Sequence, residues 1–178
     1  MPLAAGKLRG QPLEASITRK QSMPPAGSSD ATLLILGSLP GEASLKAQRY
    51  YAHPQNQFWR LLGHAIGENL AGADYDDRLT LLARRRIALW DVVGEARRAG
   101  SLDSAIRGAT PNQLREYAAT HPNLRAIAFN GKTAGRIGRL ALSEGSGIQL
   151  IDLPSSSPAF TLSFGEKAKR WAVLGPLA

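Results

Sequence analysis

The sequence lacks cysteine altogether. This excludes disulfide bonds, a cysteine nucleophile, cysteine-ligated zinc and iron–sulfur clusters. Long apolar runs are also missing, because no stretch approaches the roughly 20 residues of a membrane-spanning helix. Basic residues near the N-terminus are not followed by the apolar core of a secretory signal. We therefore expect a monomeric protein of the cytoplasm with no membrane partner.

Acidic residues are in short supply as well. Lys and Arg together number 22 against 14 Asp and Glu, which gives a formal net charge of +8. Such an excess favours an anionic partner such as nucleic acid, although many ordinary proteins are basic. The chain has 178 residues, of which 43% are hydrophobic, and it is therefore expected to fold as one globular domain.

The N-terminal segment differs in composition from the rest of the chain. Residues 1–30 are rich in Pro, Gly, Ser and basic side chains and show no sustained hydrophobic periodicity. We expect a flexible basic tail over residues 1–30 and a single domain over residues 31–178.

Four short apolar runs, each ended by a turn residue, predict buried parallel strands. They are Leu33–Leu36, Ile87–Trp90, Ala126–Phe129 and Ile148–Ile151. Helical patterns lie between and after them, over residues 58–66, 74–86, 132–142 and 166–174. A further helix is expected from Thr110 as N-cap, with Pro111 in its first turn. This alternation predicts an α/β fold with a mainly parallel sheet.

Ligands of such sheets bind beyond the carboxyl ends of the strands, so the segments after each strand are the candidate site. Several familiar chemistries are excluded there. Gly131-Lys132-Thr133 is not a P-loop, since the Gly required five residues earlier is Ala126. The serines lack the G-x-S-x-G setting of a hydrolase nucleophile, and the three histidines lack ligand spacing. We expect no metal and no cofactor.

The segments after the strands together resemble the motifs of the uracil-DNA glycosylase superfamily. The stretches that carry the resemblance are Gly37–Gly41, Ser44-Leu45, Tyr50–Trp59, Phe129–Lys132 and Leu153–Pro158, within roughly residues 32–174. In most branches the third residue of the first motif is an Asp or Asn that positions water, whereas here it is Leu39. The hypoxanthine (deoxyinosine) branch carries a similar Gly-Ser-x-Pro form, so the chain is placed there.

The resemblance implies a fold and an activity. The fold is a three-layer sandwich with a central, mainly parallel four-stranded sheet flanked by helices. The activity is a monofunctional DNA glycosylase of base-excision repair, acting without cofactor on nucleoid DNA that contains a deaminated base. The enzyme hydrolyses the N-glycosidic bond of a flipped base, hypoxanthine first. Two alternatives stay open: a uracil/thymine mismatch-specific glycosylase, and a non-catalytic nucleic-acid-binding member, which is kept open by Leu39.

Two residues are the catalytic candidates. Asn56 offers both a donor and an acceptor for a water or a departing base. It also precedes an amphipathic helix, where Asn is a favoured N-cap, and we weigh the two roles evenly. Asp91 follows the second strand and can accept from N–H groups of a base; a capping role is equally compatible with its position.

Two further sets of residues complete the predicted site. The base pocket is assigned to Gly37, Ser38, Pro40, Gly41, Tyr51, Phe58 and Asn130. Within this set Tyr51 is the better stacking partner, because Phe58 belongs to an apolar helical stripe, and a turn role is slightly favoured for Asn130. DNA phosphates are assigned to Lys132, Arg136, Ser155, Ser156, Ser157 and Lys167, through charge, hydroxyls and backbone amides.

Overall fold

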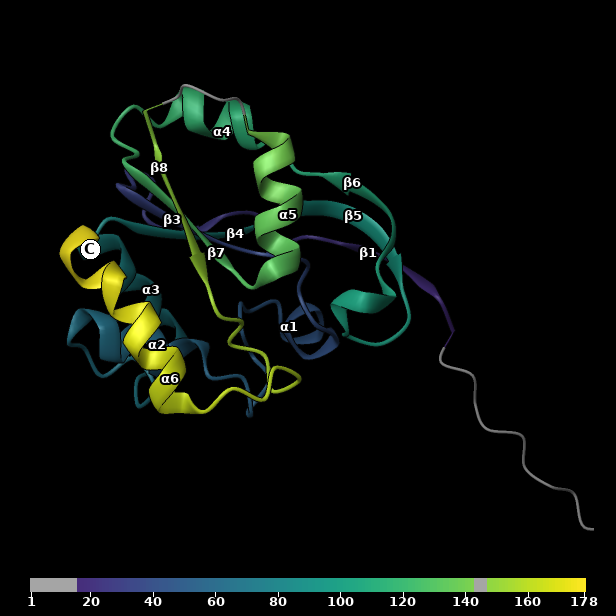
Figure 1. Cartoon of the computed structure of the whole chain (residues 1–178), viewed down its shortest axis with the longest axis horizontal. Helices are drawn as coiled ribbons and strands as arrows, with labels where there is room; N and C mark the ends of the chain where they lie inside the picture. Colours follow the sequence, from purple (N-terminus) through teal and green to yellow (C-terminus); the bar gives the residue numbers. More distant parts are fainter. Residues whose placement is uncertain (1–15, 143–146) are drawn as a thin grey trace, which may run out of the picture.

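The computed structural model describes residues 16–142 and 147–178. Its centre is a five-stranded sheet between two layers of helices (Figure 1). The strand order is β2 (Ala26–Gly27), β4 (Ile87–Asp91), β3 (Leu33–Gly37), β7 (Ala126–Asn130) and β8 (Gln149–Leu153). The last four are parallel, and the two-residue β2 adds to β4 in the antiparallel sense. The expected α/β sandwich around four parallel strands is confirmed, with one short extra strand.

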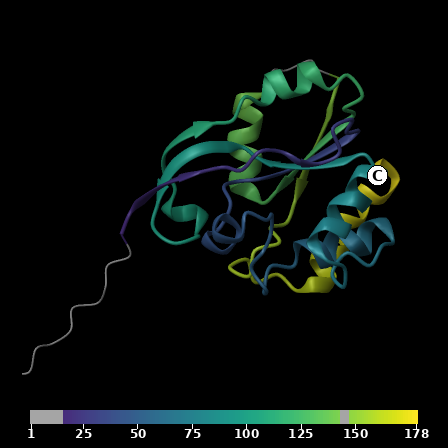
Figure 2. The ribbon, with the colours of Figure 1, turned by 180° about the vertical axis from the view of Figure 1, so that it is seen from behind.

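The inner strands β3, β4 and β7 are apolar up to their last residue because both of their faces are covered, whereas the edge strand β8 exposes Gln149 and Asp152. Along β3, Leu33 and Ile35 join one buried cluster, whereas Leu34 and Leu36 join the other. The first cluster lies under α2 (Phe58–Ile66), α3 (Tyr75–Arg84), α6 (Phe164–Trp171) and the 3₁₀ helix η2 (Ala172–Leu177). The second lies under α4 (Leu114–Thr120) and α5 (Lys132–Ala141). Figure 2 shows the two helical layers from behind. The alternating side chains of each strand thus serve two cores.

A second sheet extends from the end of β4. Its order is β1 (Thr18–Gln21), β5 (Val93–Arg98) and β6 (Arg107–Pro111), all antiparallel, with the 3₁₀ turn η1 (Asp103–Ala105) between β5 and β6. The short helix α1 (Glu42–Ala47) follows β3. The sequence pattern missed β5, β6, η1 and α1, because these elements are short or polar and carry no clear hydrophobic period.

Two expectations about boundaries are wrong. A tail was predicted for residues 1–30, but within residues 16–30 the strand β1 pairs with β5 and β2 pairs with β4. Residues 1–15 lie outside the described residues. The helix predicted from Thr110 begins later, at Leu114, with Gln113 as its N-cap. Thr110 and Pro111 close strand β6 instead, where pairing with β5 overrides the local capping signal.

The strand register places the candidate site. Gly37 lies beside Asp91 at the ends of β3 and β4, and Asn130 lies beside Leu153 at the ends of β7 and β8. The segments that follow all four parallel strands therefore meet at one edge of the sheet, as expected. Among the described residues, no helix combines the length and apolarity needed to cross a membrane.

Candidate active site

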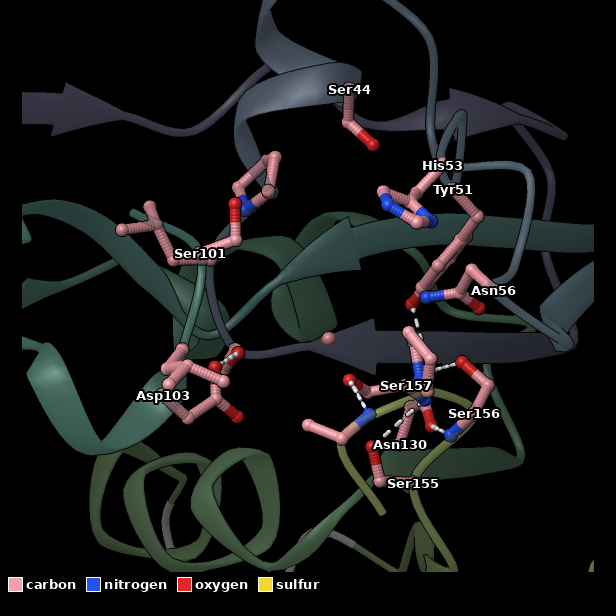
Figure 3. Close-up of a pocket in the computed structure, with 18 of the residues that line it drawn as sticks. Ser44, Tyr51, His53, Asn56, Ser101, Asp103, Asn130, Ser155, Ser156 and Ser157 are labelled. Atoms are coloured by element: carbon pink, nitrogen blue, oxygen red, sulfur yellow. Dashed lines mark hydrogen bonds between the residues drawn. The ribbon is translucent and has the colours of Figure 1, made fainter. Parts of the chain in front are cut away.

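A cavity of about 470 Å³ opens at the carboxyl edge of the parallel sheet (Figure 3). This volume is typical of small-molecule sites. Its walls come from the turn after β3, the start of α1, the segment before α2, the β5–β6 connection, the end of β7 and the loop after β8. Most residues predicted for the base pocket line it: Gly37, Ser38, Pro40, Gly41, Tyr51 and Asn130, together with Asn56 and Asp91.

The turn after β3 is held against the cavity by close packing. A Cβ on Gly37 would lie 2.9 Å from Oδ1 of Asp91 and 3.0 Å from the Tyr51 hydroxyl, so a larger residue would push these groups apart. The guanidinium of the fully buried Arg98 donates to the carbonyl of Leu39 at 3.1 Å and to that of Pro40. The Leu39 side chain is buried in the second core cluster and supplies no polar atom to the site.

Asp91 is a buried carboxylic acid at the end of β4. Only 3% of it is exposed, and Oδ2 accepts from the Ser22 hydroxyl at 2.9 Å. Burial raises the pKa of Asp91 to about 7, helped by the charge of Asp103 and opposed by Ser22 and Arg98. Near neutral pH the group can therefore be an acceptor or, when protonated, a donor.

Tyr51 forms part of one wall and Phe58 supports it from behind. Their rings are stacked with centroids 3.6 Å apart, and Tyr51 takes a left-handed backbone conformation with φ of 54°. Phe58 is fully buried and does not line the cavity. The expectation that Phe58 contacts the base is therefore wrong, because the ring belongs to the core. Burial raises the pKa of Tyr51, which keeps its hydroxyl protonated at neutral pH.

Asn56 lies just before α2 and lines the cavity. The N-cap of α2 is Gln57 and not Asn56, so the expected N-cap position is wrong by one residue. Asn56 Oδ1 nevertheless accepts from the backbone N–H of Phe58, the first residue of α2, at 3.0 Å. Since a backbone N–H requires an acceptor, this contact fixes the orientation of the amide. Nδ2 is then the atom left for a ligand, and it points into the cavity in Figure 3. Asn56 presents a donor to the pocket.

Asn130 and Ser156 clamp the end of β7 to the loop after β8. Asn130 Nδ2 donates to Ser156 Oγ and Asn130 Oδ1 accepts from the Ser156 N–H, both at 2.8 Å. The same Nδ2 lies 3.3 Å from the Tyr51 hydroxyl. Ser156 is completely buried, so its predicted contact with DNA phosphate is wrong: its hydroxyl and amide serve this clamp.

The other residues assigned to phosphate contacts differ in exposure and fall into three groups. Ser155 and Ser157 are half-buried in the cavity wall, while Lys132 and Arg136 are exposed on α5. Lys167 is only 1% exposed, and its Nζ donates to the carbonyl of Ser157 at 3.3 Å. Lys167 thus supports the loop from beneath, and its predicted role as a surface charge for DNA is wrong.

Asp103 is a functional candidate that the sequence reasoning missed. It lies in η1 and lines the cavity, and its Oδ1 accepts from the Ser38 hydroxyl at 2.6 Å. Burial raises the pKa of Asp103, while the bond from Ser38 and the charge of Arg98 lower it. The polar residues around Asp103 in the sequence could have indicated a site. Their position at the sheet edge, however, depends on the pairing of β5 with β6, which the sequence pattern did not predict.

Comparison with known proteins finds relatives over most of the chain. The family model of the uracil DNA glycosylase superfamily matches residues 24–175. A hypoxanthine DNA glycosylase of Methanosarcina barkeri is 40% identical over 154 residues, which cover 86% of this chain and 96% of the relative. Another, from Methanosarcina acetivorans, is 44% identical over 79% of this chain and 87% of its own length.

Comparison with solved structures finds a relative of the same family. A solution NMR structure of a uracil DNA glycosylase candidate from Methanosarcina acetivorans superposes with a TM-score of 0.79 at 40% identity. It covers 90% of this chain and 99% of its own. With the family model matched over most of the sequence and these relatives spanning nearly their full lengths, the chain belongs to the uracil DNA glycosylase superfamily.

Proposed function

We propose that this protein is a DNA glycosylase that removes hypoxanthine from DNA containing deoxyinosine. The observation that carries the proposal is the complementary pair of groups in one cavity, with the Asn56 amide donor on one side and the Asp91 carboxyl at the end of β4. Two relatives that align with most of this chain are named hypoxanthine DNA glycosylases.

Hypoxanthine differs from adenine at its Watson–Crick edge, where N1 carries a hydrogen and C6 carries an oxygen. An ionised Asp91 accepts from N1–H, which adenine lacks, and an amide donor such as Asn56 Nδ2 suits an acceptor atom of the base. The flipped base rests against Tyr51, whose ring is held in place by Phe58. The base must leave the duplex to reach these groups.

In the reaction the C1′–N9 bond breaks and its electron pair leaves with the base. Water supplies the oxygen that bonds to C1′. Asn56 Nδ2 donates to the base as negative charge gathers on it, which lowers the barrier in the way of an oxyanion-hole donor. The exposed Lys132 and Arg136 and the half-buried Ser155 and Ser157 contact the phosphates of the duplex.

The test is single-turnover excision on duplexes that contain inosine, uracil or a thymine·guanine mismatch. Asn56→Ala is expected to lower the rate on inosine DNA by about 10²-fold or more. Asn56→Asp keeps an acceptor for the Phe58 N–H but cannot donate to a departing base, so it is expected to be similarly slow. The matched control is Asn69→Ala, because Asn69 also accepts from a backbone N–H, that of Gly72 at 3.2 Å, outside the cavity.

Each outcome separates the candidates. Excision of inosine by the wild-type protein, lost in both Asn56 variants and kept in the Asn69 variant, supports the proposal. Excision of uracil or thymine alone would assign the protein to the mismatch-specific type. Tight binding without excision of any of the three bases would make it a non-catalytic DNA-binding member.

A further inference from the structure

The β5–β6 connection forms a wall of the cavity that is fixed from three sides. The Arg98 Nε donates to the Gly100 carbonyl at 2.9 Å, and the backbone N–H of Glu42 at the start of α1 donates to Ser101 Oγ at 2.9 Å. The Ser38 hydroxyl, after β3, donates to Asp103 at 2.6 Å. Three separate elements therefore determine where the Asp103 carboxylate lies.

The Asp103 carboxylate keeps unused acceptor capacity. Oδ1 accepts from Ser38, whereas Oδ2 makes no hydrogen bond with any residue that the structure describes. The nearby Arg98 does not form an ion pair with it, because its N–H groups are directed at the carbonyls of Leu39, Pro40 and Gly100. A partly buried carboxylate with a free oxygen is an acceptor for a water molecule or a substrate hydroxyl.

Two carboxylates occur among the described residues that line the cavity, and they differ in access. Asp91 is 3% exposed and bonded to Ser22 at the sheet end. Asp103 is half-buried at the rim, across the cavity from Asn56 and Tyr51 (Figure 3). A nucleotide held by Asn56 and Tyr51 would therefore lie between its base contacts on one side and Asp103 on the other. This arrangement leaves Asp103 to the sugar and the attacking water.

We propose that Asp103 is a catalytic residue that orients the attacking water and accepts its proton. The inference rests on the proposed glycosylase function. The water oxygen bonds to C1′ as the C1′–N9 bond breaks, and the electron pair of that bond leaves on the base. One water proton passes to Asp103 and then to solvent, while the base anion takes up a proton from solvent. The ionised carboxylate also stabilises the positive charge that develops at C1′.

The experiment measures single-turnover excision of hypoxanthine from an inosine duplex. Binding is measured separately to the same duplex carrying 2′-fluoro-2′-deoxyinosine, whose glycosidic bond resists hydrolysis. Asp103→Asn keeps the size of the side chain and an acceptor for Ser38 but cannot take a proton. It is expected to lower the rate by about 10²–10⁴-fold and to leave the affinity within about threefold. The control is Asp77→Asn, an exposed carboxylate on α3.

The pH dependence gives a second readout that does not require an inactive variant. The groups that face Asp103 are Ser38, Arg98, Asp91 and Tyr51. Because Asp103 and Asp91 must both be ionised, the wild-type rate falls as pH drops through their raised pKa values, and Ser38 bonds only to Asp103. The hydrogen bond from Ser38 lowers the pKa of Asp103, so Ser38→Ala is expected to move this acid limb to higher pH while Asp77→Asn leaves it in place.

The outcomes distinguish this proposal from the proposed function. Loss of excision with intact binding, together with the shifted acid limb of Ser38→Ala, supports a catalytic Asp103. An Asp103→Asn rate within threefold of wild type would overturn that role and leave the glycosylase assignment standing. Loss of affinity in step with rate would also overturn it. A wild-type protein that excises no hypoxanthine would overturn the proposed function itself.

Discussion

Replacing Asp91 with Asn removes a buried negative charge that destabilises the folded state. The carboxyl is 3% exposed, and its burial raises the pKa from an ordinary value of 3.8 to about 7. The folded state therefore binds this proton more tightly than the unfolded chain does. It follows that the contribution of Asp91 to stability is fully present below about pH 3.8 and is lost as pH rises through about 7.

The size of the effect follows from the two pKa values. Each unit between them corresponds to about 1.4 kcal/mol, so the fully ionised carboxylate costs the folded state on the order of 4 kcal/mol. Most of this loss develops between pH 5 and pH 8. Asn carries no charge, and the free energy of unfolding of Asp91→Asn relative to wild type is expected to rise by roughly 3 kcal/mol over that range. A poorly bonded Nδ2 would lower the stability at every pH and leave this slope unchanged.

The assay is urea unfolding followed by tryptophan fluorescence at pH 5, 6, 7 and 8. The comparison is made between variant and wild type at each pH, so titrations common to both proteins cancel. Asp77→Asn, at an exposed carboxylate in the first turn of α3, is the control, and its stability relative to wild type should change by less than about 0.5 kcal/mol over this pH range. A difference for Asp91→Asn that stays flat or shrinks with rising pH would refute the buried, proton-binding description of Asp91.

Two further predictions concern the loop after β8 and the DNA contact. Ser156→Ala removes the buried partner of Asn130 and should lower the free energy of unfolding by about 1–3 kcal/mol, measured by urea unfolding. In the same assay, Ser155→Ala and Ser157→Ala should stay within about 0.5 kcal/mol of wild type. Equal losses in all three would contradict the clamp. Duplex affinity should weaken with salt at a log–log slope of about −0.9 per phosphate neutralised, as measured by fluorescence anisotropy, and a salt-independent affinity would remove phosphate contacts from the interface.

The central sheet could be predicted from the sequence because its signal is local. A strand buried on both faces needs a continuous apolar run, and the predicted runs of Leu33–Leu36, Ile87–Trp90 and Ala126–Phe129 coincide with β3, β4 and β7. The amphipathic stripe that begins at Phe58 likewise predicts α2. In these elements the hydrophobic pattern and the tertiary packing favour the same structure.

The second sheet could not be predicted in this way. The strand β6 is exposed along its whole length, so it has no apolar period to detect, and its Thr-Pro end imitates a helix start. Its pairing with β5 spans a turn, and that of β1 with β5 spans more than 70 residues. Such contacts depend on chain topology, which hydrophobic periodicity does not encode.

The candidate site, too, could be predicted only where its residues follow from local sequence patterns. Gly37, Asp91 and Asn130 end strands that were predicted, so the sequence places them at one edge. Phe58 and Lys167 have residue types suited to a base and a phosphate, but the structure buries Phe58 beneath Tyr51 and Lys167 beneath the loop after β8. Residue type suggested their chemistry, whereas burial, which depends on neighbours from other elements, determined their roles.

The position of Asp103 shows why the second sheet matters for chemistry. β4 ends at Asp91 and the chain continues into β5, which carries Arg98 to the back of the turn after β3. There its guanidinium donates to backbone carbonyl groups and fixes the cavity wall. It forms no ion pair with Asp91 or Asp103. A cation free to pair with Asp103 would lower the basicity of the carboxylate that the proposed proton transfer needs. Through Gly100, the same buried arginine holds the connection that carries Asp103. Its charge lowers the pKa of Asp103, but burial raises that pKa by more, which favours the proposed acceptance of a proton from water.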